Sequence, residues 1–339
     1  MIKVGIIGMG GMGWYHAARY FQIPEAQLAA IADVRPERLD SKNAVVINIA
    51  NKAPVPDLSR IERFSSADSL IHEADVDVID ICLPSYLHST FAIQALQAGR
   101  HVLCEKPMAL TVEDAGAMIA ASHAAGRKLM IAQVIRFWPE YLALKRALAD
   151  KSYGQLLSLD MYRIGGRPSG WGWRNWFLDP AKSGGSMVDL HIHDVDFVNY
   201  LLGSPDWIAA SSRSADPASA CETIRALFQY HHGPQVSFTA GWSEVQLPFK
   251  AGYEAWFEKG FIRYDSNKTP VLAVYTDPER IDEQPVAYEP GDAYLNEIQY
   301  FLDCVRDDRE PLECLPESAQ ASLALLGRER EAINTRETK

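Results

Sequence analysis

A short, mostly apolar run at residues 2–7 leads directly into a glycine-rich segment, and a helical pattern follows. In a strand-to-helix turn, the first glycine permits a tight bend, the second lets the backbone approach a pyrophosphate, and the third lets helix and strand pack closely. The amino end of the helix then faces the phosphates. The segment therefore predicts a dinucleotide-binding turn formed by Gly8, Gly10, Gly11, Met12 and Gly13.

A second apolar run, residues 28–32, ends in Asp33, which lies 20 residues after Gly13. An acid at this place accepts hydrogen bonds from both ribose hydroxyls and repels a 2′-phosphate, so we predict NAD as the cofactor. Arg35 could pair with such a phosphate and leaves NADP open. The alternative interpretation is a glycine turn with an unrelated surface aspartate.

Residues 2 to about 133 alternate short apolar runs with helical patterns, which is typical of a parallel sheet with crossover helices. We therefore expect a Rossmann domain over residues 1–133. Helices are expected at 88–98 and 111–125, and the less regular stretch 40–60 is interpreted as a helix followed by a loop. The expected strands are 2–7, 28–32, 61–64, 76–83, 101–104 and 129–133.

The remainder of the chain is richer in β-strand patterns. We expect a second α+β domain over residues 134–339, built on a large, mostly antiparallel, open-faced sheet that serves substrate binding and oligomerisation. The final helix is expected to pack back on the first domain. An uncovered face of such a sheet favours homo-oligomerisation. The β-rich runs are 156–163, 220–230, 235–243 and 252–264, and the helices are 187–202, 293–307 and 316–333.

The chain has 339 residues and a formal charge of −11, which argues against binding to nucleic acid or anionic membranes. We therefore expect a small-molecule partner. The five cysteines are scattered without a C-x-x-C pair, and their odd number prevents complete pairing within one chain. No signal segment or membrane-spanning run is recognisable, so a cytoplasmic location is expected.

Lys106 lies in the segment Glu105-Lys106-Pro107 at the end of the fifth expected strand. Open α/β sheets bind their ligands at this carboxyl edge. A lysine there can donate a hydrogen bond to a substrate oxygen or join proton transfer, whereas an ordinary surface lysine is the alternative. Pro84 and His88 fall at neighbouring turns, and we expect them, with Glu105, to contact the cofactor.

A second group of polar residues lies in the helical pattern that begins after Gly184-Gly185. Helical spacing places Asp189, His193, Asp196 and Tyr200 on one face. An imidazole can take a hydroxyl proton near neutral pH, and a carboxylate one turn earlier can bind a hydroxyl or hold the imidazole. We predict that Asp189 and His193 are catalytic and bind substrate, against the alternative of a buried structural histidine.

The same run has a rival interpretation as a metal site, because His191 and His193 are spaced as in zinc-dependent hydrolases. Such sites need further ligands on later strands. Beyond residue 193, only the adjacent pair His231 and His232 is available, and no repeating βα pattern surrounds it. We therefore predict no metal.

Aromatic and polar residues before this helix could form part of the substrate site. Indoles stack on carbohydrate faces, and arginine suits hydroxyl groups. We predict substrate contacts from Trp173 and Arg174, in the loop that begins at Trp171, and from Arg136, which follows the last strand of the first domain. A packed aromatic cluster or an oligomer contact is the alternative for the loop.

Taken together, these motifs resemble the glucose-fructose oxidoreductase, inositol dehydrogenase and rhizopine-catabolism (Gfo/Idh/MocA) family. The resemblance implies a catalytic group of Lys106, Asp189 and His193, and reversible oxidation of a sugar or cyclitol hydroxyl with NAD(P). It also implies assembly as a homodimer or homotetramer. The chain departs from the family pattern at Ser186 and His191, where glycine is frequent, so substrate identity does not carry over. The residues that carry the resemblance are Gly8, Gly10, Gly13, Asp33, Pro84, His88, Glu105, Lys106, Pro107, Arg136, Gly184, Gly185, Asp189 and His193.

Three functional hypotheses follow from these patterns. The first is an NAD(P)-dependent dehydrogenase acting on a carbohydrate or polyol. The second is a cofactor-binding sensor or regulator that retains the fold without turnover. The third is a redox-assisted elimination that cleaves a glycosidic bond. A complete acid–base set favours an enzyme, because a sensor does not need one.

Overall fold

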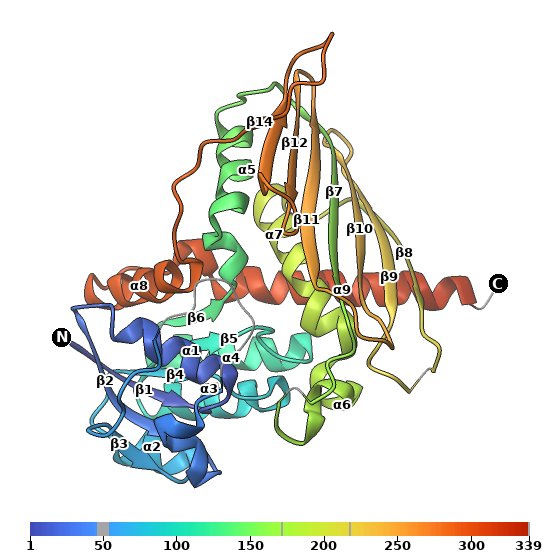
Figure 1. Ribbon diagram of the computed structural model, residues 1–339. Helices are drawn as coiled ribbons and strands as arrows, with labels where there is room; N and C mark the ends of the chain where they lie inside the picture. The colour runs from blue at the N-terminus through green and yellow to red at the C-terminus, as the bar shows by residue number, and fades with distance from the viewer. Residues whose placement is uncertain (46–53, 171, 217, 338–339) are drawn as a thin grey trace. The chain divides into compact units, whose positions relative to one another are not determined.

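The computed structural model describes residues 1–45, 54–170, 172–216 and 218–337 (Figure 1). These residues form two compact units. Unit 1 comprises the described residues within Met1–Phe137, Gly172–Trp176 and Asp292–Gln320, and unit 2 comprises the other described residues. Unit 1 thus includes segments from the region expected to form the second domain. The boundary at residue 133 stays a prediction.

The described strands of unit 1 form a six-stranded parallel sheet with the order β3-β2-β1-β4-β5-β6. The chain crosses from one side of β1 to the other after β3, so β1 and β4 flank the switch point where such sheets bind ligands. The predicted parallel sheet is confirmed. Its strands are β1 (Ile2–Ile7), β2 (Ala26–Ala32), β3 (Glu62–Phe64), β4 (Val78–Ile81), β5 (His101–Glu105) and β6 (Leu129–Ala132).

The helices of unit 1 begin and end largely where capping chemistry predicts. The hydroxyl of Thr111 accepts a hydrogen bond from the backbone N–H of Asp114, and Gly126 ends the same helix with a φ of 58°. The helices are α1 (Gly11–Tyr20), α2 (Ala67–Glu73), α3 (His88–Gln97), α4 (Val112–Ala125) and α8 (Ala293–Arg306), with short helical turns η1 (Pro36–Leu39), η2 (Ser41–Asn43), η3 (Ser85–Leu87), η4 (Val134–Phe137) and η7 (Leu312–Cys314).

The expected helix within 40–60 is only partly open to comparison. Residues 46–53 of that stretch lie outside the described residues. Residues 41–43 form the single turn η2, and 54–60 contain no regular helix or strand.

In unit 2, the described strands form an eight-stranded sheet with the order β14-β13-β12-β11-β7-β10-β9-β8. β10 runs parallel to β7 and the other pairs are antiparallel, which confirms the expected mostly antiparallel sheet. The strands are β7 (Leu156–Gly165), β8 (Trp207–Arg213), β9 (Thr223–Gln229), β10 (Gln235–Trp242), β11 (Lys250–Phe257), β12 (Gly260–Asp265), β13 (Leu272–Tyr275) and β14 (Gln284–Pro285).

One face of this sheet packs against helices α5 (Pro139–Ala149) and α7 (Ile192–Leu202) (Figure 1). The buried ring of Tyr141 on α5 makes edge contacts with Phe197 of α7 and with Tyr253 and Tyr264 of the sheet. Aromatic pairs of this kind stabilise a core beyond the area they bury. The short α6 (Pro180–Ser183) and the long α9 (Pro316–Glu337) complete the regular helices.

Unit 2 differs from expectation in its local boundaries. The run 252–264 is a hairpin of β11 and β12 rather than one strand, because residues 258–259 form a turn. The helix expected at 187–202 begins with a π-helical turn, η6 (Met187–His191), before α7. Strands β8, β13 and β14 were not expected. No helix among the described residues is both long and apolar enough to cross a membrane.

Candidate active site

In the glycine turn between β1 and α1, Gly8 and Gly13 are required sterically, whereas Gly10 leaves open space. Gly8 has a φ of 95°, and a Cβ there would lie 2.6 Å from the backbone oxygen of Cys82. A Cβ at Gly13 would lie 2.0 Å from the backbone oxygen of Gly8, whereas one at Gly10 would meet no described heavy atom within 4 Å. The turn is thus closed by Gly8 and Gly13 and open at Gly10, which fits a backbone that a pyrophosphate approaches.

The amino end of α1 is suited to an anion. Gly10 occupies the N-cap position, so no side chain caps the helix, and its first turn contains no acidic residue. The backbone N–H groups at a helix start carry partial positive charge. The residues present therefore fit the pyrophosphate of a dinucleotide, with Gly11, Met12 and Gly13 in the first turn.

Asp33 follows β2 at the same edge of the sheet and is 7% exposed. Its carboxylate accepts hydrogen bonds from the backbone N–H of Met9 at 3.0 Å and from the backbone N–H of Arg35 at 2.9 Å. The guanidinium of Arg35 also donates to both carboxylate oxygens, at 3.1 and 3.2 Å. The structure thus holds Asp33 beside the glycine turn, with Arg35 paired to it.

Lys106 follows directly after β5, and its backbone N–H donates to Oε2 of Glu105 at 3.1 Å. Glu105 is buried, and its Oε1 lies 3.2 Å from Nε2 of His16, although the two are not aligned as a hydrogen bond. Nδ1 of His16 contacts Oδ2 of Asp80 at 2.9 Å. The residue before Lys106 is therefore held within a buried cluster of charged groups.

The described residues bring His16, Asp80 and Cys82 close enough for one metal ion, because their donor atoms lie within 4.8 Å of one another. Hydrogen bonds already account for this proximity. Sγ of Cys82 lies 3.6 Å from Nδ1 of His16 and 3.5 Å from Oδ1 of Asp80, and burial raises the pKa of the Cys82 thiol. The cluster is an internal polar network.

His88, a predicted cofactor contact, points both ring nitrogens at backbone carbonyls. Nδ1 lies 2.7 Å from the oxygen of Pro107 and Nε2 lies 2.8 Å from that of Leu83. Burial lowers the pKa of His88, which is 1% exposed. His88 therefore ties the loop after β4, which contains Pro84, to the segment after Lys106, and a polar contact from its ring to the cofactor stays a prediction.

Arg136, predicted to bind substrate, makes hydrogen bonds inside unit 1, and its contact with substrate stays a prediction. It is 2% exposed, and its guanidinium donates to the backbone oxygen of Glu313 at 2.8 Å and to the hydroxyl of Ser318 at 2.9 Å. A buried arginine with these contacts ties η4 to η7 and to the first turn of α9. Sequence position alone could not reveal these partners, which lie 177 and 182 residues away.

Trp173 and Arg174, also predicted substrate contacts, belong to the segment Gly172–Trp176 that clusters with unit 1. The guanidinium of Arg174 lies 4.3 Å from the centre of the Trp173 ring, and that of Arg35 lies 6.0 Å from it. Trp173 thus lies near the ion pair of Asp33. Trp171, at the start of the predicted loop, lies outside the described residues.

In unit 2, Asp189 lies within η6 and His193 in the first turn of α7. Asp189 is 7% exposed and His193 is partly exposed. Asp196, expected on the same face, is instead 1% exposed and accepts a hydrogen bond from the hydroxyl of Ser322 at 2.8 Å. The π-helical turn changes the phase of the helix, so an unbroken 3.6-residue pattern does not describe this run.

His191 pairs with an acid that the sequence did not indicate. Its Nε2 lies 3.1 and 3.2 Å from the two carboxylate oxygens of Glu329 in α9, and both side chains are fully buried. Burial opposes a charge on His191, but the Glu329 carboxylate outweighs this effect and raises the pKa of the imidazole. Nε2 of His191 is therefore engaged by Glu329.

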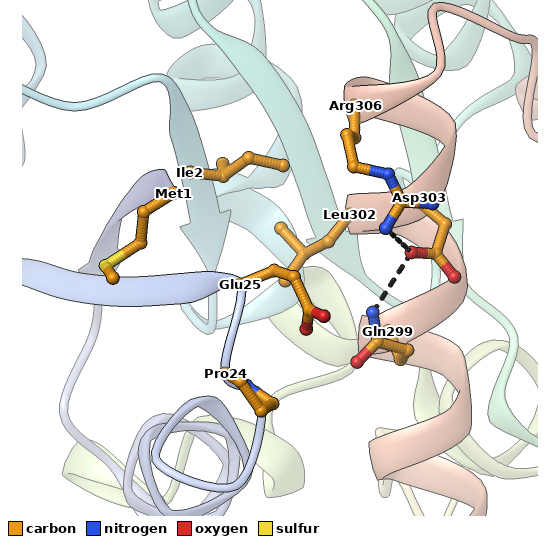
Figure 2. Close-up of a pocket in the computed structure, with 8 residues that line it drawn as sticks. All are labelled: Met1, Ile2, Pro24, Glu25, Gln299, Leu302, Asp303 and Arg306. Atoms are coloured by element: carbon orange, nitrogen blue, oxygen red, sulfur yellow. Dashed lines mark hydrogen bonds and ion pairs between the residues drawn. The ribbon is translucent and has the colours of Figure 1, made fainter.

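A pocket at the opposite edge of the parallel sheet contains none of the predicted site residues (Figure 2). Oδ1 of Asp303 is bonded there to Arg306 and Gln299. The pocket lies at the start of β1 and before β2, away from the carboxyl ends where such sheets bind ligands. It is lined by Met1, Ile2, Pro24, Glu25, Gln299, Leu302, Asp303 and Arg306.

The parallel sheet, the open glycine turn at its switch point and the carboxylate of Asp33 define a dinucleotide-binding protein of the Rossmann class. Comparison with known proteins agrees. Residues 2–133 match the model of an oxidoreductase family with an NAD-binding Rossmann fold, and residues 141–263 match the GFO/IDH/MocA C-terminal domain.

Three of the curated relatives match 91% of this chain. Myo-inositol 2-dehydrogenase of Thermotoga maritima is 31% identical over 91% of this chain and 90% of its own length. Among solved structures, UDP-N-acetylglucosamine 3-dehydrogenase GnnA of Acidithiobacillus ferrooxidans has a TM-score of 0.77 at 25% identity, covering 98% of both chains. The WlbA dehydrogenase of Bordetella pertussis, in complex with NADH and UDP-GlcNAcA, has a TM-score of 0.78 at 26% identity, covering 98% of this chain and 96% of its own. The chain belongs to the Gfo/Idh/MocA family of oxidoreductases.

Proposed function

We propose that this protein is an NAD-dependent dehydrogenase that oxidises a hydroxyl group of a sugar, a cyclitol or a sugar derivative. The observation that carries the proposal is the place of Lys106, directly after β5 on the sheet edge that also carries the glycine turn. A cation at that edge can act on a substrate oxygen beside the cofactor. The named activities of the relatives support a polyhydroxylated substrate.

NAD is proposed over NADP because the Asp33 carboxylate is fixed beside the turn by the backbone of Met9. A carboxylate in that position suits two ribose hydroxyls and repels a 2′-phosphate. The guanidinium of Arg35 already pairs with the carboxylate of Asp33, so its positive charge is less available to a 2′-phosphate. When bound, NAD supplies the acceptor for the hydride that leaves the carbon of the substrate.

The roles proposed for the side chains are those that the family resemblance implies, and the chemistry of each side chain suits its role. His193 takes the proton of the reacting hydroxyl, and Lys106 donates a hydrogen bond to the same oxygen as it becomes a carbonyl. Asp189 accepts hydrogen bonds from a substrate hydroxyl and orients the base. Glu105 positions Lys106 through the hydrogen bond that it accepts from the lysine backbone.

The decisive experiment is a panel of sugars, inositols and sugar acids, free and nucleotide-linked, assayed with NAD and NADP at 340 nm. We expect absorbance to rise with at least one member, and faster with NAD. Silence across the panel, with tight NADH binding, would instead favour a sensor. A product lacking a glycosidic bond that the substrate contained would favour the redox-assisted elimination.

We further propose that the protein forms homodimers or homotetramers in the cytoplasm. On the face of the large sheet opposite Tyr253, the paired side chains Trp256, Phe261 and Tyr275 form an aromatic row, and Trp256 is 51% exposed. Exposed apolar rows of this kind favour association. Light scattering should give the mass of a multimer, and Trp256→Glu should lower it; a monomeric wild-type protein would contradict the proposal.

A further inference from the structure

The π-helical turn η6 carries Asp189 and leads directly into His193, so its shape decides where both side chains point. π-helical turns are rare, because a single wide turn is less favourable than a continued α-helix. Those that do occur are often found at functional sites. Such a turn needs contacts outside itself. In unit 2 these contacts converge from two sides.

The start of the turn is anchored to the segment before β9. The backbone N–H of Ser186 donates to the oxygen of Ala220 at 3.0 Å, and its hydroxyl donates to the oxygen of Glu222 at 3.2 Å. Gly184 adopts a φ of 75°, and a Cβ there would lie 2.4 Å from Cβ of Val188. Entry into the turn is therefore tightly packed.

The end of the turn is anchored to α9 by the pair of His191 and Glu329. Both side chains have 0% exposure, and the imidazole ring also packs edge-on against Phe238 with the ring centres 5.2 Å apart. A buried carboxylate without a partner is strongly unfavourable, so loss of this contact would destabilise the fold. Asp194 and Glu222 add negative charge around the same imidazole.

The same helix contacts the run at three further places. Ser322, seven residues before Glu329 and thus on the same face of α9, donates to Asp196. Arg330 donates to the backbone oxygen of Gly184 at 3.0 Å and lies 3.2 Å from Sδ of Met187. One face of α9 therefore contacts the run before, at the end of, and after the π-helical turn.

We propose that Glu329 and His191 are positioning residues that hold η6 in its π-helical form and thereby place Asp189 and His193 for the reaction. The inference rests on the proposed function for its catalytic consequence. The claim that the pair holds η6 in its π-helical form does not depend on the proposed function. Neither residue need touch substrate or cofactor for this role.

The test compares Glu329→Ala, Glu329→Gln and His191→Gln with the control Arg328→Gln. Arg328 adjoins Glu329 on α9 but bonds to Ser204 and to the backbone of Pro205, beyond the end of α7. The amide of Glu329→Gln still accepts a hydrogen bond from Nε2 of His191, and that of His191→Gln still offers a donor to Glu329.

On the substrate found in the panel, Glu329→Ala should lower kcat about 100-fold, as expected for a misplaced catalytic group. The KM for NAD and the dissociation constant of NADH should change less than twofold. Glu329→Gln and His191→Gln should restore most of kcat, and Arg328→Gln should match the wild type. A merely structural role would not lower kcat while leaving cofactor binding unchanged, and the glutamine variants would not restore kcat. A wild-type kcat in Glu329→Ala overturns the proposal.

Amide hydrogen exchange in peptides covering residues 184–193 gives a readout that needs no substrate. Exchange there should be faster in Glu329→Ala than in the wild type or in Arg328→Gln, because the turn opens more often. Unchanged exchange overturns the proposal. If the wild type is silent on every substrate, the proposed function fails while exchange still decides the role of the pair. If Glu329→Ala does not fold, the same measurements on Glu329→Gln and His191→Gln test the proposal. Loss of activity in both variants would contradict the role of the hydrogen bond.

Discussion

Nδ1 of His16 lies 2.9 Å from Oδ2 of Asp80, and neither side chain is exposed to solvent. Asp80 also accepts a hydrogen bond from the hydroxyl of Tyr20 at 2.9 Å. Burial opposes a charge on His16, but the surrounding Cys82 and Asp80 raise its pKa well above the usual range. The pair joins α1 to β4 below the glycine turn.

Asp80→Asn should therefore destabilise the protein strongly. Removing one member of a buried ion pair leaves the other charge uncompensated, which lowers the free energy of unfolding by about 3–5 kcal/mol. Urea denaturation followed by far-UV circular dichroism measures this change. The control is Asp75→Asn, whose exposed carboxylate pairs with Lys3 at the surface. Equal stability of the two variants would contradict the importance of the buried pair.

Glu297 on α8 is fully buried, and neither of its carboxyl oxygens has a hydrogen-bond partner among the described residues. Burial, together with the negative charge of Glu105, raises the pKa of Glu297 well above its ordinary value. The folded protein thus retains a proton that the unfolded chain releases. Stability attributable to this group is highest below its unfolded pKa and declines as the pH rises towards its folded pKa.

Glu297→Gln should remove that pH dependence, because the amide resembles the protonated carboxyl in shape and charge. The variant should gain stability over the wild type at pH 8, by about 1.4 kcal/mol for each unit of raised pKa, and lose the advantage near pH 4. Urea titrations at both pH values test this. Replacing the exposed Glu289 with Gln should give no such pH-dependent difference.

Gly10 and Gly13 offer a matched pair of substitutions within the glycine turn. A Cβ at Gly10 meets no described atom within 4 Å, so Gly10→Ala should fold normally but raise the dissociation constant of NADH at least about tenfold. A Cβ at Gly13 lies 2.0 Å from the oxygen of Gly8, so Gly13→Ala should cost about 1–3 kcal/mol or more of stability. Thermal melts and fluorescence titrations separate the two effects. Normal NADH binding by Gly10→Ala would contradict the proposed place of the pyrophosphate.

Asp33→Ala should change cofactor preference. Loss of the hydrogen bonds that the ribose hydroxyls donate to the carboxylate should weaken NAD binding by about 10–100-fold. NADP should lose less or gain affinity, because the guanidinium of Arg35 is released from the carboxylate. Calorimetric titration with both cofactors measures the ratio. A wild-type protein that prefers NADP would show that Asp33 does not select the cofactor.

Lys106→Met and His193→Leu should each lower kcat by about 10²–10⁴-fold, the range expected when a general acid or base is removed. NADH binding should be retained, because the glycine turn and Asp33 are unchanged. Steady-state kinetics and fluorescence titration distinguish the two quantities. Lys268→Met, at an exposed lysine, serves as the control. Near-normal turnover in either active-site variant would disprove the proposed roles.

The local features of both units could be predicted because neighbouring residues encode them. The spacing of Gly8, Gly10 and Gly13 belongs to one turn, in which a Cβ would collide with the backbone at Gly8 and at Gly13, while the space at Gly10 is open. Thr111 and Gly126 similarly mark the ends of α4 by capping chemistry. The parallel and mostly antiparallel sheets were expected from the alternation of apolar runs.

Contacts between distant residues could not be predicted in this way. Arg136 looked like a ligand-facing residue after a strand, yet its guanidinium is buried against Glu313 and Ser318. The sequence indicated weakly that Asp80 is internal, because it is a charged residue within an apolar strand. Nothing in the sequence indicated that Glu297 and Glu329 are buried, since an acid on an amphipathic helix normally faces solvent.

By itself the sequence determined that the chain forms a dinucleotide-binding sheet and a second, largely antiparallel sheet, because turns, caps and strand periodicity are local properties. Only the tertiary structure decided which polar residues are internal. It paired His16 with Asp80 and His191 with Glu329, and it converted the start of an expected α-helix into a π-helical turn. The physical reason is that a buried charge is stable only beside a partner, and folding alone brings together partners such as His191 and Glu329, which are 138 positions apart in the chain.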